Sequence, residues 1–480
     1  MSDEQHRERG SLVELLPRVG RPPNLPRRHG EPSQVDVADI QGNVLRGYTY
    51  PKAAYIFLRI DDVPKAKALL DRMLPRITNG EPWDGDGPAS AIQLAFTYAG
   101  LERLGVPPET LASFPEPFRQ GMAARAGWLG DHGASAPERW ESGLGTGEAH
   151  VLVSVWAVDN DHLDEVREEL RQVGAEAGAT TVVNETRAEA LSDGRDHFGF
   201  FDGIAQPAVA GTGVEGRRGD GQPDGAGGWR DVATGEFLLG YPDEDGELPP
   251  APAAPFDRNS TFMVYRKLQA NVPAFRRFVE EAGATYPGGA ELLAAKIVGR
   301  WPDGTPLAVS PGAPDPALAA DPARINDFSY EGDPEGYRCP LGAHIRRVNP
   351  RDGKGFFGGR LTNRHRIIRR GRTYGPPLEA GVLADDGQER GLAFVCFNAD
   401  LFRQFEVIQA LWINDGDRFG LGDDKDFLIG CPDGGEGKMT IQGSPPHFLS
   451  PQPSFVTVRG GEYLFQPSIG ALRWLAGAPA

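Results

Sequence analysis

The chain has 480 residues, of which 39% are hydrophobic, and it carries a formal net charge of -17 at pH 7. A chain of this length exceeds the size at which one hydrophobic core usually stops growing, so two packed domains are expected. The acidic balance argues against nucleic acid and anionic membrane surfaces as binding partners. No stretch approaches the roughly eighteen apolar residues of a membrane-spanning helix, so we expect no membrane segment.

The first part of the chain is rich in Arg, Glu and Pro and lacks the apolar stretch of a signal peptide. We therefore interpret residues 1–34 as a disordered tail and predict a cytoplasmic protein. The three cysteines, Cys339, Cys396 and Cys431, show no CxxC spacing. This pattern argues against a disulfide framework and against a structural zinc site.

The first half of the chain alternates between extended and helical patterns. The patterns predict strands at residues 53–60, 91–99, 150–158 and 180–188, and helices at residues 62–74 and 161–173. Asp62 is expected to cap the first helix, with Pro64 in its first turn. The order β-α-β-β-α-β is that of the ferredoxin-like fold, in which helices cover one face of an antiparallel sheet.

The second half repeats this order. Strands are predicted at residues 261–268, 365–371, 392–399 and 462–468, and helices at residues 271–283 and 400–412. The triplet at residues 271–273, Asn-Val-Pro, echoes the Asp-Val-Pro at residues 62–64. We therefore predict an α+β fold of two ferredoxin-like domains, residues 35–210 and 211–480. Residues 211–228 have the composition of a flexible connection between them.

The segment HFGFFDGIAQP, residues 197–207, places Asp202 at a turn between phenylalanines and glycines. Asp-Gly is among the commonest turn signals, and an isolated Asp-Gly is usually a turn and nothing more. This one lies just after the first repeat closes. A residue at this point can lean across from one domain toward a pocket in the other.

The segment CPLGAHIRRVNPRD, residues 339–352, surrounds His344 with small apolar residues on one side and arginines on the other. An imidazole on an apolar wall beside guanidinium groups suits an axial haem ligand with anchored propionates. A structural histidine beside a solvated basic face is the alternative, and this stretch alone favours that alternative. In the segment at residues 365–376, a strand pattern directs Arg369 and Arg370 to opposite faces, one inward and one to solvent.

Taken together, these segments resemble the dye-decolorizing haem peroxidases. GFFDG, residues 199–203, resembles their GxxDG motif. Further segments resemble the family in the family's order, namely residues 39–48, 235–244, 343–351, 367–376 and 391–412. The resemblance covers roughly residue 39 to the C-terminus. It implies two ferredoxin-like domains, with one haem b per chain bound between sheet and helices mainly in the C-terminal domain.

The resemblance also implies roles for individual residues. His344 is the expected axial ligand of the haem iron, Asp202 the distal acid, and Arg369 the distal arginine. Arg370 is the rival of Arg369 if the register slips. The other expected cofactor-binding residues are Arg346, Asn349, Arg351, Leu392, Phe394, Phe201 and Gly203, of which Leu392 and Phe394 match positions that wall the peroxide side of the haem.

Peroxide cleavage requires a proton to move between the two oxygens and a cation beside the charge that develops. Asp202 is the expected general base and acid, and Arg369 the expected cation. A carboxyl group ordinarily has a pKa of about 3.9 and histidine of about 6.5, so a carboxylate remains a base in mildly acidic solution. We therefore expect an acidic pH optimum. Phe200 and Phe201 are expected to keep the site dry.

The implied partners are hydrogen peroxide and aromatic or dye reductants. Electrons from bulky dyes are expected to pass through aromatic side chains, and Trp412, Tyr374 and Tyr337 lie nearest the haem motifs in sequence. Mn²⁺ is a further conceivable electron donor, although no ligands for it stand out. Residues 415–426 match a calcium loop only in part. We expect a monomer or a small homo-oligomer.

Two other functions are compatible with the sequence. A haem-binding or haem-handling protein without peroxidase turnover would keep His344 but would need neither Asp202 nor Arg369. A duplicated ferredoxin-like binding module without a cofactor would need none of the three, because a fold does not determine a function. The joint presence of all three residues favours the peroxidase.

Overall fold

The computed structural model describes residues 34–83, 85–176, 178–224, 228–431 and 436–477. In it the first repeat forms four strands, β1 (Lys52–Ile60), β2 (Ser90–Phe96), β3 (Val151–Ala157) and β4 (Thr180–Glu189). The strands pair antiparallel in the order β4-β1-β3-β2. Helices α3 (Val63–Met73) and α8 (Asn160–Arg171) connect them. As predicted, the Asp62 carboxylate accepts a hydrogen bond from the Lys65 amide, at 3.1 Å, and caps α3. The predicted β-α-β-β-α-β order is confirmed.

The second repeat has the same strand order. Its strands are β7 (Thr261–Ala270), β8 (Ile368–Arg369), β9 (Arg372–Tyr374), β10 (Gly391–Asn398) and β13 (Val456–Gln466). They pair as β13-β7-β10-β8, with β9 also on β10. In both repeats the fourth strand is therefore followed by the first, the third and the second. Helix α9 (Val272–Gly283) is the first connection, and Asn271, the first residue of the repeated triplet, caps it as Asp62 caps α3.

The second connection differs from the prediction. Residues 400–412 are helical, but they form wide π turns, Phe402–Glu406 and Ile408–Ile413, in place of a regular α-helix. The Glu406 amide, for example, donates to the Leu401 carbonyl at 2.9 Å. Wide turns of this kind occur frequently at functional sites.

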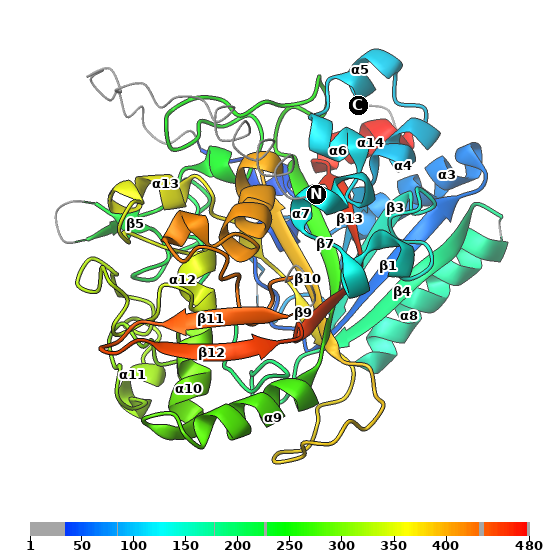
Figure 1. Ribbon diagram of the computed structural model, residues 1–480. Coiled ribbons are helices and arrows are strands. Elements are labelled where there is room, and N and C mark those ends of the chain that lie inside the picture. Colours follow the sequence, from blue (N-terminus) through cyan, green and yellow to red (C-terminus); the bar gives the residue numbers. More distant parts are fainter. Residues whose placement is uncertain (1–33, 84, 177, 225–227, 432–435, 478–480) are drawn as a thin grey trace, which may run out of the picture. The chain divides into compact units, whose positions relative to one another are not determined.

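The two repeats share one sheet. Phe465 of β13 pairs with Phe96 of β2, which joins the two sets of strands into a single nine-stranded sheet. At the far edges, the Thr373 hydroxyl of β9 donates to the Glu189 carbonyl of β4, so the sheet curves back on itself. Figure 1 shows β7, β10 and β13 running side by side through its middle. Residues 35–480 form one compact unit, and the domain boundary at residue 210 stays a prediction.

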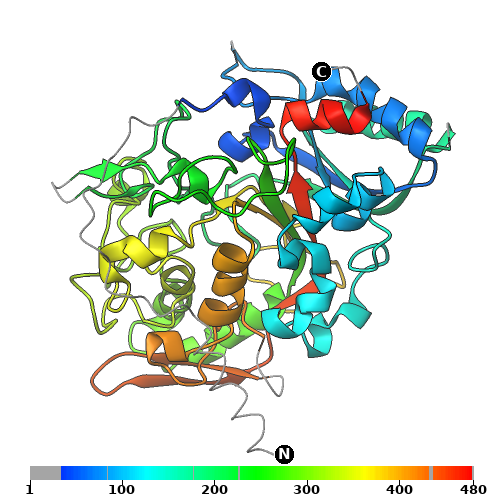
Figure 2. The same cartoon turned by 90° about the horizontal axis from the view of Figure 1, so that it is seen from above.

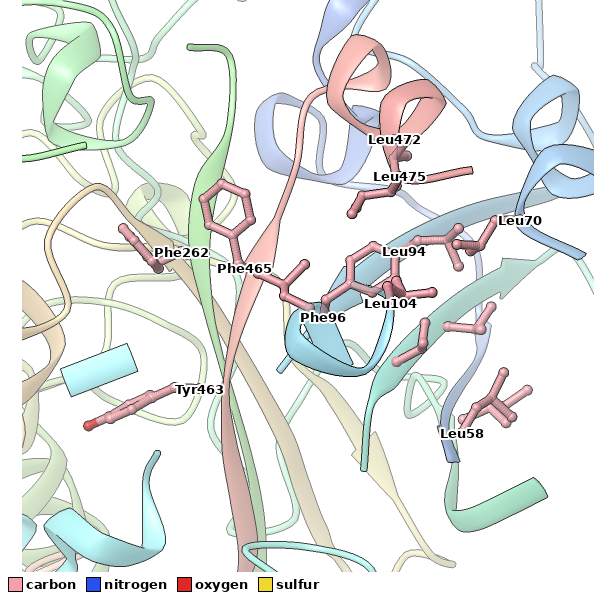
Figure 3. Close-up of a cluster of buried hydrophobic side chains, with 14 of the residues drawn as sticks. Leu58, Leu70, Leu94, Phe96, Leu104, Phe262, Tyr463, Phe465, Leu472 and Leu475 are labelled. Atoms are coloured by element: carbon pink, nitrogen blue, oxygen red, sulfur yellow. The ribbon is translucent and has the colours of Figure 1, made fainter. Parts of the chain in front are cut away.

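The two faces of the sheet bury different sets of side chains. One face gathers large aromatics, including Tyr55, Trp156 and Tyr265, in one core cluster. The other packs against helices, among them α14 (Ile469–Ala476), which lies beside α3 (Figure 2). In Figure 3, Leu472 and Leu475 of α14 approach the apolar side chains of α3 and β2. This helix-covered face is the one predicted for a ferredoxin-like sheet.

Shorter elements complete the described chain, and the sequence patterns did not indicate them. The helices are α2 (Gly42–Leu45), α4 (Tyr98–Arg103), α5 (Pro108–Ala112), α6 (Glu116–Gln120), α7 (Ala126–Leu129), α10 (Gly289–Val298), α11 (Pro316–Ala319), α12 (His344–Val348) and α13 (Arg360–Asn363). The strands are β5 (Gln222–Pro223), β6 (Trp229–Arg230), β11 (Gly437–Ile441) and β12 (His447–Gln452).

The predicted flexible connection is packed against the fold in part, at residues 219–222, whereas residues 215–218 are exposed. Asp220 and Gln222 are buried and bind across the fold. The Asp220 carboxylate accepts from the Asn326 side chain at 2.8 Å, and Oε1 of Gln222 accepts from the Asn363 side chain at 2.6 Å. Composition missed this because glycine also permits close backbone contacts. The predicted tail lies outside the described residues except for Gln34. None of the described helices combines the length and apolar character that crossing a membrane requires.

Candidate functional site

His344 is held by a buried carboxylate. It is the first residue of α12, and its Nδ1 lies 2.9 Å from Oδ2 of Asp426, a side chain with no exposed surface. Burial acts to raise the pKa of Asp426, but the neighbouring His344, Arg347 and backbone amides outweigh it and hold that pKa below its usual range. An imidazole that donates through Nδ1 presents Nε2 as a lone-pair ligand.

The sequence patterns did not reveal this role of Asp426. They showed it only as the last acid of a partial calcium loop, whereas its Oδ1 accepts the amides of Leu428 and Ile429 at 3.0 Å. Within the described ranges, no group of three or more His, Cys, Asp or Glu side chains is arranged to hold a metal ion. The described acids therefore provide no calcium or manganese cage.

Two buried arginines anchor α12. Arg346 donates to the Asp333 carboxylate at 3.0 Å and to the Cys339 carbonyl at 2.6 Å, and it stacks over the Tyr330 ring. Arg347 donates to the Trp412 carbonyl at 2.8 Å and to the Asp424 carbonyl. The guanidinium of Arg346, an expected cofactor contact, thus donates to other parts of the protein, and these bonds fix the helix that carries His344.

Asp202 lies on an exposed turn. Its amide donates to the Gly194 carbonyl at 3.1 Å, and its Oδ1 accepts from the Gly203 amide at 2.6 Å. Gly203 has a φ of 79°, a conformation that favours glycine and explains this residue of the motif. Phe200 is buried in an apolar cluster, but Phe201 exposes 44% of its surface. The burial of Phe200 agrees with the expected shielding, and the shielding role of Phe201 stays a prediction.

Arg369 shares a sheet face with Leu392 and Phe394. Arg369 of β8 is paired with Cys396 of β10, and directly paired residues project to the same face of a sheet. Leu392 and Phe394 alternate with buried Ala393 and Val395 on β10, so they share the face of Cys396. Both remain only half-buried although β10 lies inside the sheet. Three of the expected site residues therefore gather on one face.

Arg370 points the other way. It donates to the Asn43 carbonyl at 2.9 Å and to the Val44 carbonyl at 3.2 Å, whereas Arg369 donates to the Ala205 carbonyl at 2.9 Å. The predicted divergence is confirmed, but the prediction that one of the two is solvated is wrong, since both bind backbone oxygens. Arg369 is the arginine in contact with the segment that carries Asp202.

An excess of positive charge is buried close to Arg369. The cluster consists of Arg300, Arg351 and Arg366, which donate to backbone oxygens of residues 220–221 and 325–328. Asp220 supplies the carboxylate among these neighbours, and that carboxylate accepts from Asn326. Burial lowers the pKa of Arg300 to about 9 and that of Arg366 to about 10, and neighbouring arginines add to the effect. A cluster of this kind suits an anionic group. Arg351, an expected cofactor contact, belongs to it.

Asn349, another expected contact, ends α12. Its backbone amide donates to the Ile345 carbonyl at 3.1 Å. Its Oδ1 is buried and, among the described residues, accepts no hydrogen bond. An unsatisfied buried acceptor is costly, so this oxygen is available to a donor that completes the site.

A short segment, residues 299–304, connects the two sides of the site. Gly299 approaches Ala343 and Ile345 so closely that a β-carbon would overlap the Ile345 side chain. At the other end, the Pro302 carbonyl accepts from the Phe201 amide at 3.1 Å. The helix of His344 and the turn of Asp202 are therefore held by the same piece of backbone.

The three candidate electron-transfer aromatics differ in exposure. Trp412 is 2% exposed and Tyr374 5%, whereas Tyr337 is 60% exposed. Only Tyr337 of these three can therefore contact a bulky donor directly. Trp412 packs against the rings of Phe356 and His365.

Comparison with known proteins identifies the family. Residues 39–190 match the family described as "DyP dimeric alpha+beta barrel domain". The chain is also 31% identical to dye-decolorizing peroxidase msp1 of Mycetinis scorodonius, over 92% of this chain and 87% of that protein. The chain belongs to the dye-decolorizing peroxidase family. It is also 30% identical to the multifunctional dye peroxidase DyP2 of Amycolatopsis sp., over 91% of this chain and 95% of that protein.

Solved structures of dye-decolorizing peroxidases share the fold. The fungal enzyme from Auricularia auricula-judae superposes with a TM-score of 0.80 at 26% identity, covering 92% of this chain and all of that one. A deferrochelatase of Yersinia pestis matches over only 81 residues, at 37% identity and 16% of its length. Membership of the dye-decolorizing peroxidases makes the chain a haem-dependent peroxidase.

Proposed function

We propose that the chain binds one haem b with His344 as axial ligand, reduces hydrogen peroxide, and oxidises dyes and phenols. The observation that carries the proposal is the pairing of His344 with the buried Asp426, which leaves Nε2 for the iron. Carboxylate-bound imidazoles of this kind are oriented and more basic as metal ligands.

The described residues fit haem in three respects. Imidazole suits the iron, and the half-buried Leu392 and Phe394 offer an apolar wall on the face they share with Arg369. The buried arginine cluster, with Arg351 as its member nearest α12 in sequence, has the charge to hold propionates. Haem supplies the redox-active iron at which peroxide reacts.

The distal side would then be served by Asp202 and Arg369. Asp202 takes a proton from one peroxide oxygen and returns it to the departing oxygen, as a general base and then a general acid. Arg369 places its positive charge where negative charge develops on that oxygen. Phe201 and Gly203 shape the turn that presents Asp202, Gly203 through its positive φ.

The names of similar enzymes support the proposed reducing substrates. One relative in the family is described in complex with 2,6-dimethoxyphenol, and others are named for dyes. We propose phenols and dyes as donors for this chain, with Tyr337 as the accessible one of the three candidate aromatics. No cluster of acids in the described ranges supports Mn²⁺ as a donor.

The test is an absorption spectrum of the protein expressed with sufficient iron, compared with His344→Ala and Asp202→Asn. We expect a Soret band that changes on adding peroxide, is lost or altered in His344→Ala, and persists in Asp202→Asn with a peroxide reaction slowed by a factor of about 10² to 10⁴. A wild-type protein without a Soret band, or unchanged peroxide kinetics in Asp202→Asn, would contradict the proposal.

The short match to a deferrochelatase gives a second candidate, a haem-handling function. Such a function would make haem-loaded protein accumulate metal-free porphyrin, which fluoresces, and would not require Asp202 or Arg369. Porphyrin fluorescence without peroxide-dependent dye bleaching would favour this candidate. Bleaching without porphyrin release would favour the peroxidase.

A further inference from the structure

Three hydrogen bonds clamp the segment of Asp202 onto the hairpin of Arg369. At the start of the segment, Nε2 of His197 donates to the Tyr374 carbonyl at 2.8 Å. At its end, the Ala205 carbonyl accepts from Nη2 of Arg369 at 2.9 Å, and Oε1 of Gln206 accepts from the Arg369 amide at 3.0 Å. Asp202 lies between these two attachment points, and Tyr374 belongs to β9, directly after β8.

The segment is also braced from within. The Asp196 carboxylate accepts from the Phe200 amide at 3.0 Å, and Nη1 of Arg195 donates to the Gly199 carbonyl at 2.9 Å. Near its middle the segment is also tied outward, because the Phe201 amide donates to the Pro302 carbonyl at 3.1 Å. A loop with these internal bonds moves as a unit, so the bonds at its two ends, together with the bond from Phe201 to Pro302, determine where Asp202 lies.

His197 occupies its position at a cost. It is buried, and because a carbonyl can only accept, its Nε2 carries the proton. Its Nδ1 is buried without a partner among the described residues. An unsatisfied buried acceptor destabilises a fold. An apolar side chain at this position would leave no buried acceptor unsatisfied, but it could not donate to the Tyr374 carbonyl. The bond from Nε2 is therefore what histidine provides at position 197.

We infer that His197 and Gln206 are positioning residues that fix the Asp202 carboxylate relative to the Arg369 guanidinium. Both act through the residues that they hold in register, His197 through its bond to the Tyr374 carbonyl and Gln206 through its bond to the Arg369 amide. Proton transfer and charge stabilisation require both groups within a fraction of an ångström of their working positions. This inference rests on the proposed function, because it assigns the clamp to the distal chemistry.

The experiment compares haem-loaded His197→Leu, which removes the donor, with His197→Gln, whose side-chain amide can replace it. His150→Leu is the matched control, because His150 is a partly buried histidine in the first repeat whose Nδ1 accepts the Ile60 amide at 2.9 Å. The measurements are haem content, melting temperature, and the stopped-flow rate constants for peroxide reaction and for cyanide binding to the ferric haem. Cyanide is a suitable probe because one relative is described in complex with it.

We expect His197→Leu to keep its haem and to lose about tenfold to a hundredfold in both rate constants, with partial recovery in His197→Gln. His150→Leu should leave both rates unchanged. In an Asp202→Asn background, His197→Leu should add little further loss, since residues that act as a unit are not additive. An undiminished rate in His197→Leu, or an equal loss in both backgrounds, would overturn the inference.

A second variant keeps the inference testable if His197→Leu does not fold. Gln206→Met removes the acceptor for the Arg369 amide at similar side-chain size, and it should lower the same two rates with haem retained. Normal rates in Gln206→Met would overturn its part of the inference. Failure of the proposed function itself would look different, because wild-type protein would then show no Soret band and no cyanide-induced shift.

Discussion

His344 and Asp426 are 82 residues apart in the chain, yet Nδ1 of the one lies 2.9 Å from Oδ2 of the other. The Asp426 side chain is fully buried and also accepts two backbone amides, so its position is determined by the surrounding fold. The imidazole is therefore held in one orientation before any ligand binds to Nε2.

Replacing Asp426 by Asn should weaken this arrangement without removing it. The amide can still accept a hydrogen bond, but it lacks the charge that makes the imidazole electron-rich, so we expect the haem reduction potential to rise and the peroxide rate constant to fall by about 10- to 100-fold. Spectroelectrochemistry and stopped-flow kinetics measure the two quantities. An unchanged potential would show that the carboxylate does not influence the axial ligand.

Arg369 and Arg370 should respond differently to substitution by Leu. Arg369→Leu removes the cation on the face of Leu392 and Phe394, and we expect a loss of about 10² to 10³ in the peroxide rate constant. Arg370→Leu removes the bonds to the carbonyls of Asn43 and Val44, so it should lower the melting temperature and leave that rate nearly unchanged. Rates and melting curves of both variants check this, and the reverse pattern would reassign the distal arginine to Arg370.

Glu462 should make the protein less stable as the pH rises. Burial raises its pKa to about 8, and its carboxylate accepts only the Gly145 amide among the described hydrogen bonds. The folded protein thus holds this proton more tightly than the unfolded chain. The resulting stability is full below the ordinary pKa of 4.5 and is lost as the pH rises through about 8.

Glu462→Gln should remove this dependence. We expect the variant to be more stable than the wild type by a few kcal/mol at about pH 9, and to differ little from it at about pH 5. Melting temperatures at the two pH values measure the effect. A stability difference that is the same at both would show that Glu462 does not ionise in this range.

Phe465 should be one of the costliest core residues to truncate. It is fully buried, pairs with Phe96 across the junction of the two repeats, and packs against the Phe262 ring at a centroid distance of 5.4 Å (Figure 3). Phe465→Ala should destabilise the fold by about 3 to 5 kcal/mol. Phe448→Ala, at a position 69% exposed, is the control and should change the melting temperature little.

The sequence by itself determined the repeated β-α-β-β-α-β order, the cap at Asp62, and the segments that carry His344 and Asp202. These features are local: alternation and helical periodicity follow from which faces of an element are buried, and caps follow from unsatisfied amides at a helix end. They can therefore be recognised without knowing what the element packs against.

Only the tertiary structure decided the joining of the repeats at Phe96 and Phe465, the different partners of Arg369 and Arg370, and the partners of Arg346 and Asp426. Each depends on where a side chain points and on what lies opposite it. Alternation shows that Arg369 and Arg370 face apart, but not which face the loop of Asp202 occupies. Likewise, a carboxylate looks the same in sequence at a solvated turn and behind a histidine, because only long-range packing places its partner.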